Sequence, residues 1–249
     1  MDNPQEITLN NSIPPCNLVS NMNTIISLLS LDLQKNIQIS INILRQALDK
    51  YGFSGISISF NGGKDALVML ILYFYTLRQY SGENEIKMKK IPAIYIQNPY
   101  PFSEIECFVK KCSENYVLDL VYKKSPMKTA LKEYLDEHSE IKAILVGSRR
   151  NDPGCSMLKH FNPTDFEWPS CIRVHPIIDW CYSNIWEFLR GLNIEYCSLY
   201  DEGYTSIGGI QDTFRNPELQ LDHDKFKPAY ELIDGHKERL GRKYPLKNY

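Results

Sequence analysis

Short apolar runs alternate with helical patterns between residues 56 and 147, and this alternation constrains the fold more than any other feature of the sequence. We expect four strands, at 56–60, 91–97, 117–122 and 143–147. Strands that alternate with helices predict an α/β fold, in which a mostly parallel, twisted sheet carries helices on both faces. Ligands of such sheets bind at the carboxyl ends of the strands. Three loops are expected to converge there: 60–65, 97–101 and 147–152.

The segments on either side of this alternation have a different character. Residues 1–20 are rich in Asn, Pro and Ser and predict a loose tail, whereas apolar residues at helical spacing predict one helix over 24–51, ended by Gly52. After the fourth strand the chain carries loops with Pro, Asp, Trp and Tyr. We therefore expect a single domain over 21–249, with a core at about 50–150 and a loop-rich extension at about 151–249.

Composition excludes several classes of protein. The 249 residues include 28 Lys and Arg against 30 Asp and Glu, which argues against binding nucleic acid by phosphate neutralisation. The seven cysteines are scattered, with no C-x-x-C, and argue against a zinc ribbon or a disulfide framework. The start of the chain lacks the pattern of a signal peptide, and the longest apolar run, 66–77, is too short to span a membrane. We expect a cytoplasmic protein without nucleic-acid or membrane partners; its protein partners stay open.

The turn between the first strand and its helix is the first candidate site. Its sequence is Ser59-Phe60-Asn61-Gly62-Gly63-Lys64-Asp65. The two glycines permit positive φ and a close approach of the backbone to a ligand, and the N–H groups at the start of a helix favour an anion. Lys64 is expected to add a mobile positive charge. The alternative is an ordinary Gly-Gly turn with Asp65 as the helix N-cap, and the Walker A spacing is absent.

Two further clusters follow the fourth strand. The first contains Gly147, Ser148, Arg149, Arg150 and Asp152. Its arginines suit phosphate oxygens, and its carboxylate suits Mg²⁺. The second contains Asp165, Trp168 and Arg173; its indole suits stacking on a flat heterocycle whose ring N–H the Asp accepts, although packing alone is the alternative for the Trp.

Several of these motifs resemble those of a known family. S-x-N-G-G-K-D after a first strand resembles the pyrophosphate loop (PP-loop, here residues 59–65) of the adenine nucleotide α-hydrolase superfamily. The ordered set G-x-R-R-x-D-P, T-D-x-x-W-P, R-x-x-P-I-I-D-W, L-Y-D-x-G-Y-T-S-I-G and N-P-x-L resembles the eukaryotic FAD synthases (FMN adenylyltransferases), of the 3′-phosphoadenosine-5′-phosphosulfate (PAPS) reductase-like branch. The resemblance covers roughly residues 50–245. Ala66 and Leu67 depart from it, because the superfamily usually has Ser or Thr just after the Asp.

The resemblance implies a Rossmann-like PP-loop fold with a C-terminal flavin-binding extension. It also implies the Mg²⁺-dependent transfer of AMP from ATP to FMN, giving FAD and pyrophosphate without a protein nucleophile. The implied catalytic residues are Asn61, Lys64, Asp65, Arg149, Arg150, Asp152, Arg239 and Arg242, with Asp152 as the metal ligand. The implied binding residues are Ser59, Phe60, Asn61, Gly62, Gly63, Lys64, Asp65, Ile96, Gly147, Ser148, Asp152, Asp165, Trp168, Arg173 and Arg242.

Two other readings of the sequence stay open. One keeps the fold but changes the acceptor, to give a PP-loop adenylyltransferase or sulfonucleotide enzyme that acts on another anion. The absence of a Cys-Gly-Ile/Leu-His nucleophile after Cys197 argues against a PAPS reductase. The other is a flavin- or nucleotide-binding module without catalysis, which Ala66 and Leu67 motivate.

Overall fold

The computed structural model describes residues 22–84 and 90–243. The predicted tail at 1–20 lies outside these residues. The single helix expected over 24–51 is interrupted: a helical stretch at 22–26 is followed by a turn, and α2 (Leu31–Tyr51) then begins. The break arises because the Ser30 side chain accepts a hydrogen bond from the Leu33 amide and so caps α2. Gly52 ends the helix with φ of 67°, as expected.

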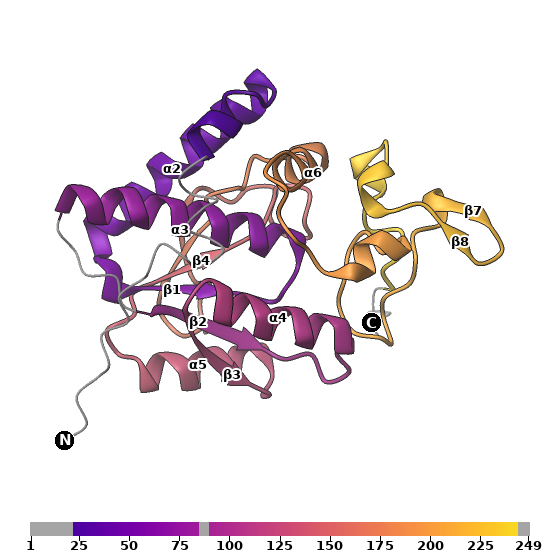
Figure 1. Ribbon diagram of the computed structural model, residues 1–249. Helices are drawn as coiled ribbons and strands as arrows, with labels where there is room; N and C mark the ends of the chain where they lie inside the picture. Colours follow the sequence, from indigo (N-terminus) through magenta and orange to yellow (C-terminus); the bar gives the residue numbers. More distant parts are fainter. Residues whose placement is uncertain (1–21, 85–89, 244–249) are drawn as a thin grey trace.

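A six-stranded sheet forms the centre of the molecule (Figure 1). Its strands are β1 (Ile56–Ser59), β2 (Ile91–Ile96), β3 (Leu118–Lys123), β4 (Ala143–Val146), β5 (Phe161–Pro163) and β6 (Ile172–Val174). The order is β3-β2-β1-β4-β6-β5, and every neighbouring pair is parallel except β5 with β6. The mostly parallel α/β fold is therefore confirmed. The three-residue strands β5 and β6 were not predicted.

Helices cover the two faces of this sheet unequally. Because side chains alternate along a strand, β2 sends Ala93 and Tyr95 toward the larger core and Ile94 toward a smaller one. The larger core is covered by α2, α3 (Lys64–Asn84), α4 (Ser103–Asn115) and α6 (Tyr182–Gly191). The smaller core is covered by α5 (Met127–Glu137) alone, which lies beneath the sheet in Figure 1.

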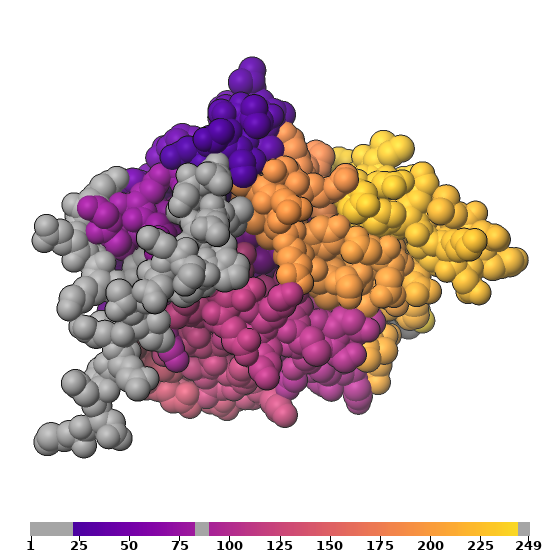
Figure 2. Space-filling view, in the orientation of Figure 1, coloured from indigo at the N-terminus to yellow at the C-terminus, as the bar shows by residue number. Residues whose placement is uncertain are grey.

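The chain after α6 is loop-rich, as expected, and builds one end of the molecule (orange to yellow in Figures 1 and 2). It contains a hairpin and four short 3₁₀ turns: η2 (Ser198–Glu202), η3 (Pro217–Leu219), β7 (Gln220–Asp222), β8 (Lys225–Phe226), η4 (Ala229–Glu231) and η5 (Gly235–Lys237). The Tyr182 hydroxyl donates to the carbonyl of Ala229 at 2.7 Å and ties this segment to α6. Among the described helices, none has the length and apolar character needed to cross a membrane.

Candidate active site

Two loops meet at the point where the strand order of the sheet reverses. The PP-loop follows β1, and residues 147–152 (the β4 loop) follow the adjacent parallel strand β4, so both leave the carboxyl edge of the sheet. Gly62 has φ of 73°, which confirms the expected left-handed conformation at this position. Gly63 does not have a positive φ. A Cβ on Gly147 would lie 2.8 Å from the Ala66 nitrogen, so the absence of a side chain lets the two loops touch. This position is where α/β sheets bind ligands.

Four charged side chains form a buried ion cluster between the two loops: Lys64, Asp65, Arg149 and Glu238. The ammonium of Lys64 lies 3.0 Å from Asp65 Oδ2, and the Nε of Arg149 lies 2.6 Å from Asp65 Oδ1. Both cations also contact the carboxylate of Glu238. Lys64 and Arg149 are 2% and 1% exposed, so the mobile charge expected of Lys64 is wrong. Two cations are balanced by two anions.

The pKa values within the ion cluster follow from this pairing. Burial alone would raise the pKa of Asp65, but the Arg149 and Lys64 charges outweigh it, and the pKa is lowered. Burial alone would lower the pKa of Lys64, but Asp65 and Glu238 outweigh it, and the pKa is raised. The pKa of Arg149 is raised by the same two carboxylates, against its burial. All three side chains therefore keep their charges near neutral pH.

Aromatic residues close the inner side of the ion cluster. The Lys64 ammonium lies 5.3 Å from the centre of the Tyr182 ring and 5.7 Å from that of Tyr200, which allows cation–π attraction. The Tyr200 hydroxyl accepts a hydrogen bond from the Lys64 amide at 2.9 Å. Burial raises the pKa of both phenols well above that of free tyrosine, so they stay neutral. Tyr200 thus holds the backbone of the PP-loop at the start of α3.

The two residues that depart from the usual PP-loop pattern are buried. Leu67 is 1% exposed and belongs to the larger core, and Ala66 is 6% exposed, with its backbone against Gly147. A small residue at 66 therefore agrees with the close approach of the β4 loop. Packing therefore explains why Ala66 and Leu67 stand where the superfamily usually has Ser or Thr.

Glu238 is the member of the ion cluster that the sequence motifs did not predict. It lies 174 positions from Lys64 in the chain and outside all the motifs quoted above. Buried hydrogen bonds hold its backbone: the Thr205 hydroxyl donates to the Glu238 carbonyl, and Asn216 donates to Thr205 and to the carbonyl of Lys237. The motifs that contain Thr205 and Asn216 therefore serve to deliver this carboxylate.

The remaining predicted residues of the β4 loop separate into two groups. Asp152 stays close to the ion cluster, because its carboxylate accepts a hydrogen bond from the Arg149 amide at 2.9 Å and lies 3.5 Å from Arg239. Arg150 points elsewhere: its guanidinium pairs with Asp179 and donates to two carbonyls of the 156–158 turn. The structure therefore brings Asp152 and Arg239 to the cluster and leaves Arg150 outside it.

Two predicted residues border the third loop, residues 97–101, which follows β2. Ile96 is half-buried at the end of β2 and packs against the smaller core. Arg242 lies 3.4 Å from Asp212 and against Gly208, and the neighbouring Gly209 packs on Asn98. All three predicted loops therefore meet at the carboxyl edge. Ser59, Phe60, Asn61 and Ser148 lie along this edge too, with Asn61 exposed and accepting from the Gly63 amide.

Asp165, Trp168 and Arg173 lie near the opposite edge of the sheet. Pro163 pairs with Ile172, and Ile172 pairs with Ala143 at the start of β4, so the 164–169 loop leaves from the amino ends of β4 and β6. Asp165 lies 3.1 Å from Arg173, and its side chain is 70% exposed. The structure therefore brings Asp165 and Arg173 together. Arg173 lies level with Ile144, two strand residues before Val146 at the carboxyl edge, or about 7 Å at roughly 3.3 Å per residue.

The family resemblance implies Mg²⁺, an ion that prefers carboxylate, phosphate and water oxygens. Among residues 22–84 and 90–243, no three His, Cys, Asp or Glu side chains form a group that could hold a metal ion. Asp152 is the one predicted metal ligand, and burial raises its pKa. A single carboxylate fits a Mg²⁺ ion that takes its other ligands from phosphates and water, as this ion often does.

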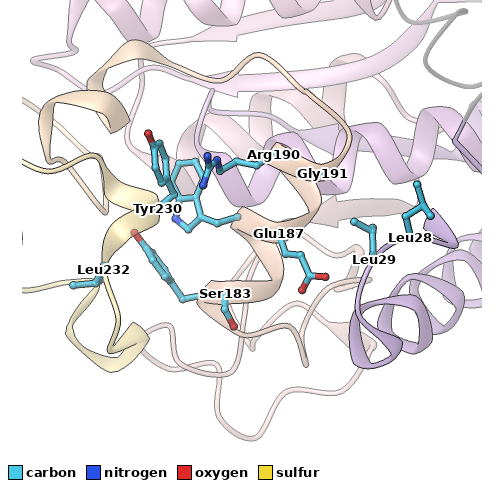
Figure 3. Close-up of a pocket in the computed structure, with 10 residues that line it drawn as sticks. Leu28, Leu29, Ser183, Glu187, Arg190, Gly191, Tyr230 and Leu232 are labelled. Carbon is cyan, nitrogen blue, oxygen red and sulfur yellow. The ribbon is translucent and has the colours of Figure 1, made fainter. Parts of the chain in front are cut away.

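A groove of about 430 Å³ lies beside the site rather than within it (Figure 3). It runs between α6, the turn at Leu28–Leu29 and the segment with Tyr230 and Leu232. The Arg190 guanidinium stacks on the Tyr230 ring at 4.0 Å in its wall. Its lining shares Tyr182 with the surroundings of Lys64 but contains none of the predicted site residues.

The parallel sheet with a Gly-Gly loop at its switch point is that of a PP-loop protein, and comparison with known proteins agrees. Residues 55–130 and 120–215 match the phosphoadenosine phosphosulfate reductase domain. A probable FAD synthase of Schizosaccharomyces pombe is 41% identical over 84% of this chain and 80% of its own length. The flavin adenine dinucleotide synthase of Saccharomyces cerevisiae is 35% identical over 67% of this chain and 60% of its own length.

Solved structures agree as well. The Candida glabrata FMN adenylyltransferase in complex with FAD and inorganic pyrophosphate superposes with a TM-score of 0.87, at 27% identity, over 93% of this chain and 97% of that one. The chain therefore belongs to the FAD synthase family, within the PAPS reductase-like domain proteins. It spans somewhat under two thirds of the S. cerevisiae relative.

Proposed function

We propose that this chain transfers the adenylyl group of ATP to the phosphate of FMN, giving FAD and pyrophosphate. As a member of the FAD synthase family it is a nucleotidyltransferase. The observation that carries the proposal is the coincidence of a PP-loop at the strand switch point with a Trp-Asp loop at the far end of the neighbouring strands. A substrate that carries a phosphate on one end and a flat ring on the other suits this arrangement.

The two ends of FMN are assigned to the two edges of the sheet. The flavin ring is placed at the 164–169 loop, where the exposed carboxylate of Asp165 accepts a ring N–H and Trp168 offers an aromatic face. The ribityl chain is assigned to the face of β4 and β6 that carries Arg173, which pairs in register with Ile144 of the smaller core. The phosphate of FMN thereby reaches the carboxyl edge.

The ATP phosphates are assigned to the PP-loop and the β4 loop. The Nη1 atom of Arg149 is buried and has no hydrogen-bond partner within the described residues, so it is a donor left for a phosphate oxygen. Arg239 and Arg242 approach the same edge from the C-terminal segment. Lys64 acts behind the loop, because its ammonium is already paired and buried.

No protein nucleophile is needed in this reaction. The phosphate of FMN attacks the α-phosphorus of ATP, the bond to the β-phosphate oxygen breaks, and pyrophosphate leaves with the electron pair. The protein orients the two substrates and stabilises the negative charge that develops. Mg²⁺ bound together with ATP would supply positive charge to the phosphates. We place Asp152 as its protein ligand, supported by its position between the β4 loop and Arg239.

A direct assay tests the proposal. Purified protein is incubated with FMN, ATP and Mg²⁺, and FAD and pyrophosphate are quantified. We expect equal amounts of the two products, and no product when EDTA replaces Mg²⁺. Tight FAD binding without product formation would instead identify a binding module. Product formation from another anion but not from FMN would identify a different acceptor.

We also propose a cytoplasmic location. The six cysteines among the described residues are free thiols, which agrees with a reducing compartment. Fractionation of cells that express the tagged full-length chain tests this location.

A further inference from the structure

One carboxylate connects the two loops of the candidate nucleotide site. Glu238 contacts Lys64 at the end of the PP-loop and Arg149 in the β4 loop, and it comes from neither loop but from the distant C-terminal segment. The two loops touch through Gly147, but side-chain charge bridges them through Glu238 and Asp65. Glu238 therefore adds to the direct contacts a second charge bridge between the two loops, from a residue outside both.

The backbone of Glu238 is held firmly. Its carbonyl accepts from Thr205 Oγ1, and its amide donates to the Gly235 carbonyl at 3.2 Å. Asn216 supports the same turn through Thr205 at 2.8 Å and through the Lys237 carbonyl at 2.9 Å. Thr205 and Asn216 are 1% and 0% exposed. A carboxylate on such a braced turn is preorganised and does not need to be ordered when substrate binds.

The charge balance of the cluster also depends on Glu238. Without it, two buried cations share the single carboxylate of Asp65, from opposite sides. A buried charge without its partner is costly, so the side chains and the loops that carry them rearrange. Such a rearrangement moves the Arg149 guanidinium and the first turn of α3 together, because both cations contact Asp65.

We propose that Glu238 is a positioning residue for adenylyl transfer, which bridges Lys64 and Arg149 and so holds the PP-loop and the β4 loop at the spacing that the ATP phosphates require. This inference rests on the proposed function and extends it to a residue outside the nucleotide loops. Glu238 acts through the two cations and does not itself contact substrate.

The variant Glu238→Gln tests the proposal, because it keeps the shape of the side chain and removes its charge. We expect kcat to fall at least tenfold and KM for ATP to rise at least fivefold, while KM for FMN stays within twofold. The matched control is Glu231→Gln, which removes an exposed carboxylate of the same segment that pairs with Lys227 at 3.4 Å. This control is expected to keep all three parameters.

A rise in KM for ATP without a rise in KM for FMN distinguishes a positioning role of Glu238 from a purely structural one. Loss of folded enzyme alone lowers kcat and leaves both KM values unchanged, and that result would overturn the proposal. Wild-type kinetics in Glu238→Gln would overturn it as well. A rise in KM for FMN with KM for ATP unchanged would place Glu238 with the flavin and also contradict it.

A double variant covers the case in which Glu238→Gln does not fold. In Lys64→Met with Glu238→Gln, one cation and one anion are removed together, and Asp65 remains with Arg149. We expect the melting temperature to return toward that of the wild type while KM for ATP stays at least fivefold raised. Recovery of activity together with stability would show that the bridge between the loops is unnecessary.

The proposed function and this inference fail in different ways. A wild-type protein that forms no FAD under any condition refutes the function. Calorimetric titration of ATP into the wild type and Glu238→Gln still tests the inference: at least fivefold weaker binding in the variant supports it, and equal affinity overturns it.

Discussion

The two ends of the sheet each carry an Asp–Arg pair, in opposite environments. At the carboxyl edge, Asp65 and Arg149 lie 2.6 Å apart and are 22% and 1% exposed. At the other edge, Asp165 and Arg173 lie 3.1 Å apart and are 70% and 27% exposed. Buried ion pairs cannot lose one member without a large penalty, whereas exposed pairs contribute little to stability. The first pair therefore shapes the loops, and the second leaves its carboxylate available to a ligand.

Substitution of Asp65 is the strongest test of this difference between the buried and the exposed pair. In Asp65→Asn, Lys64 and Arg149 are left with Glu238 as the only carboxylate of the ion cluster. We expect FAD formation to fall at least a hundredfold and the free energy of unfolding to fall by about 3 kcal/mol, as when one partner leaves a buried pair. Steady-state FAD formation and urea unfolding measure the two effects. Activity within tenfold of the wild type would show that the cluster is dispensable.

His175 sharpens the contrast, because it is as buried as Arg149 but unpaired. It is 1% exposed, and neither ring nitrogen has a hydrogen-bond partner among the described residues. Burial, aided by the charges of Arg173 and His160, lowers its pKa to about 4. The unfolded chain binds a proton near pH 6.5 and the folded one only near pH 4.

The sign of the effect follows from this difference. The contribution of His175 to the free energy of unfolding is fully present above pH 6.5 and is lost as the pH drops toward 4, by about 3 kcal/mol at 1.36 kcal/mol per pH unit. In His175→Phe this part of the decrease is expected to disappear. The measurement is urea unfolding of both proteins between pH 7 and 4, and parallel pH curves would contradict the prediction.

The exposed pair is tested by Asp165→Ala. We expect FMN affinity to fall about tenfold, or 1.4 kcal/mol, because one hydrogen bond from the charged acceptor to the flavin ring is lost. KM for ATP and the melting temperature are expected to stay close to those of the wild type, since an exposed pair contributes at most about 1 kcal/mol to stability. Quenching of flavin fluorescence measures the affinity. Unchanged FMN affinity would show that the flavin ring does not bind at the 164–169 loop.

The smallest effect is expected at an exposed ion pair outside the site, which serves as a reference for the other variants. Lys132 and Asp136 form an exposed i,i+4 pair on α5, 67% and 63% exposed. Lys132→Ala is expected to change the free energy of unfolding by less than about 0.5 kcal/mol and to leave the kinetics unchanged. A larger loss would mean that exposed pairs matter more in this protein than the comparison assumes.

Local patterns predicted the parts of the fold that local chemistry determines. The strong alternation of apolar strands and amphipathic helices gave the parallel sheet, and Gly62 gave the left-handed turn. Strands β5 and β6 escaped prediction because three residues carry too little periodicity. The helix expected from residue 24 was broken by a cap at Ser30, whose partner Glu187 lies on α6.

The candidate site was predictable in its residue types but not in its electrostatics. The PP-loop, Arg149 and Asp152 follow strands, and strand ends can be read from sequence. Whether Lys64 is mobile or locked depends on Glu238, which follows an irregular turn and has no spacing signal. The nearest predicted residue in the chain is Arg239, which follows it directly. Burial of a charge is a property of the assembled fold, so the sequence could not show it.

The antiparallel return of β5 has a consequence for the product. That return places the 164–169 loop at the far edge of the sheet, so in the proposed binding mode FAD spans both edges, as FMN does, and adds the adenylyl contacts that FMN lacks. A ligand held at two linked points rebinds at one before it leaves the other, so its dissociation is slower than that of either half. We therefore expect release of FAD, rather than formation of the new phosphate bond, to set the pace of turnover.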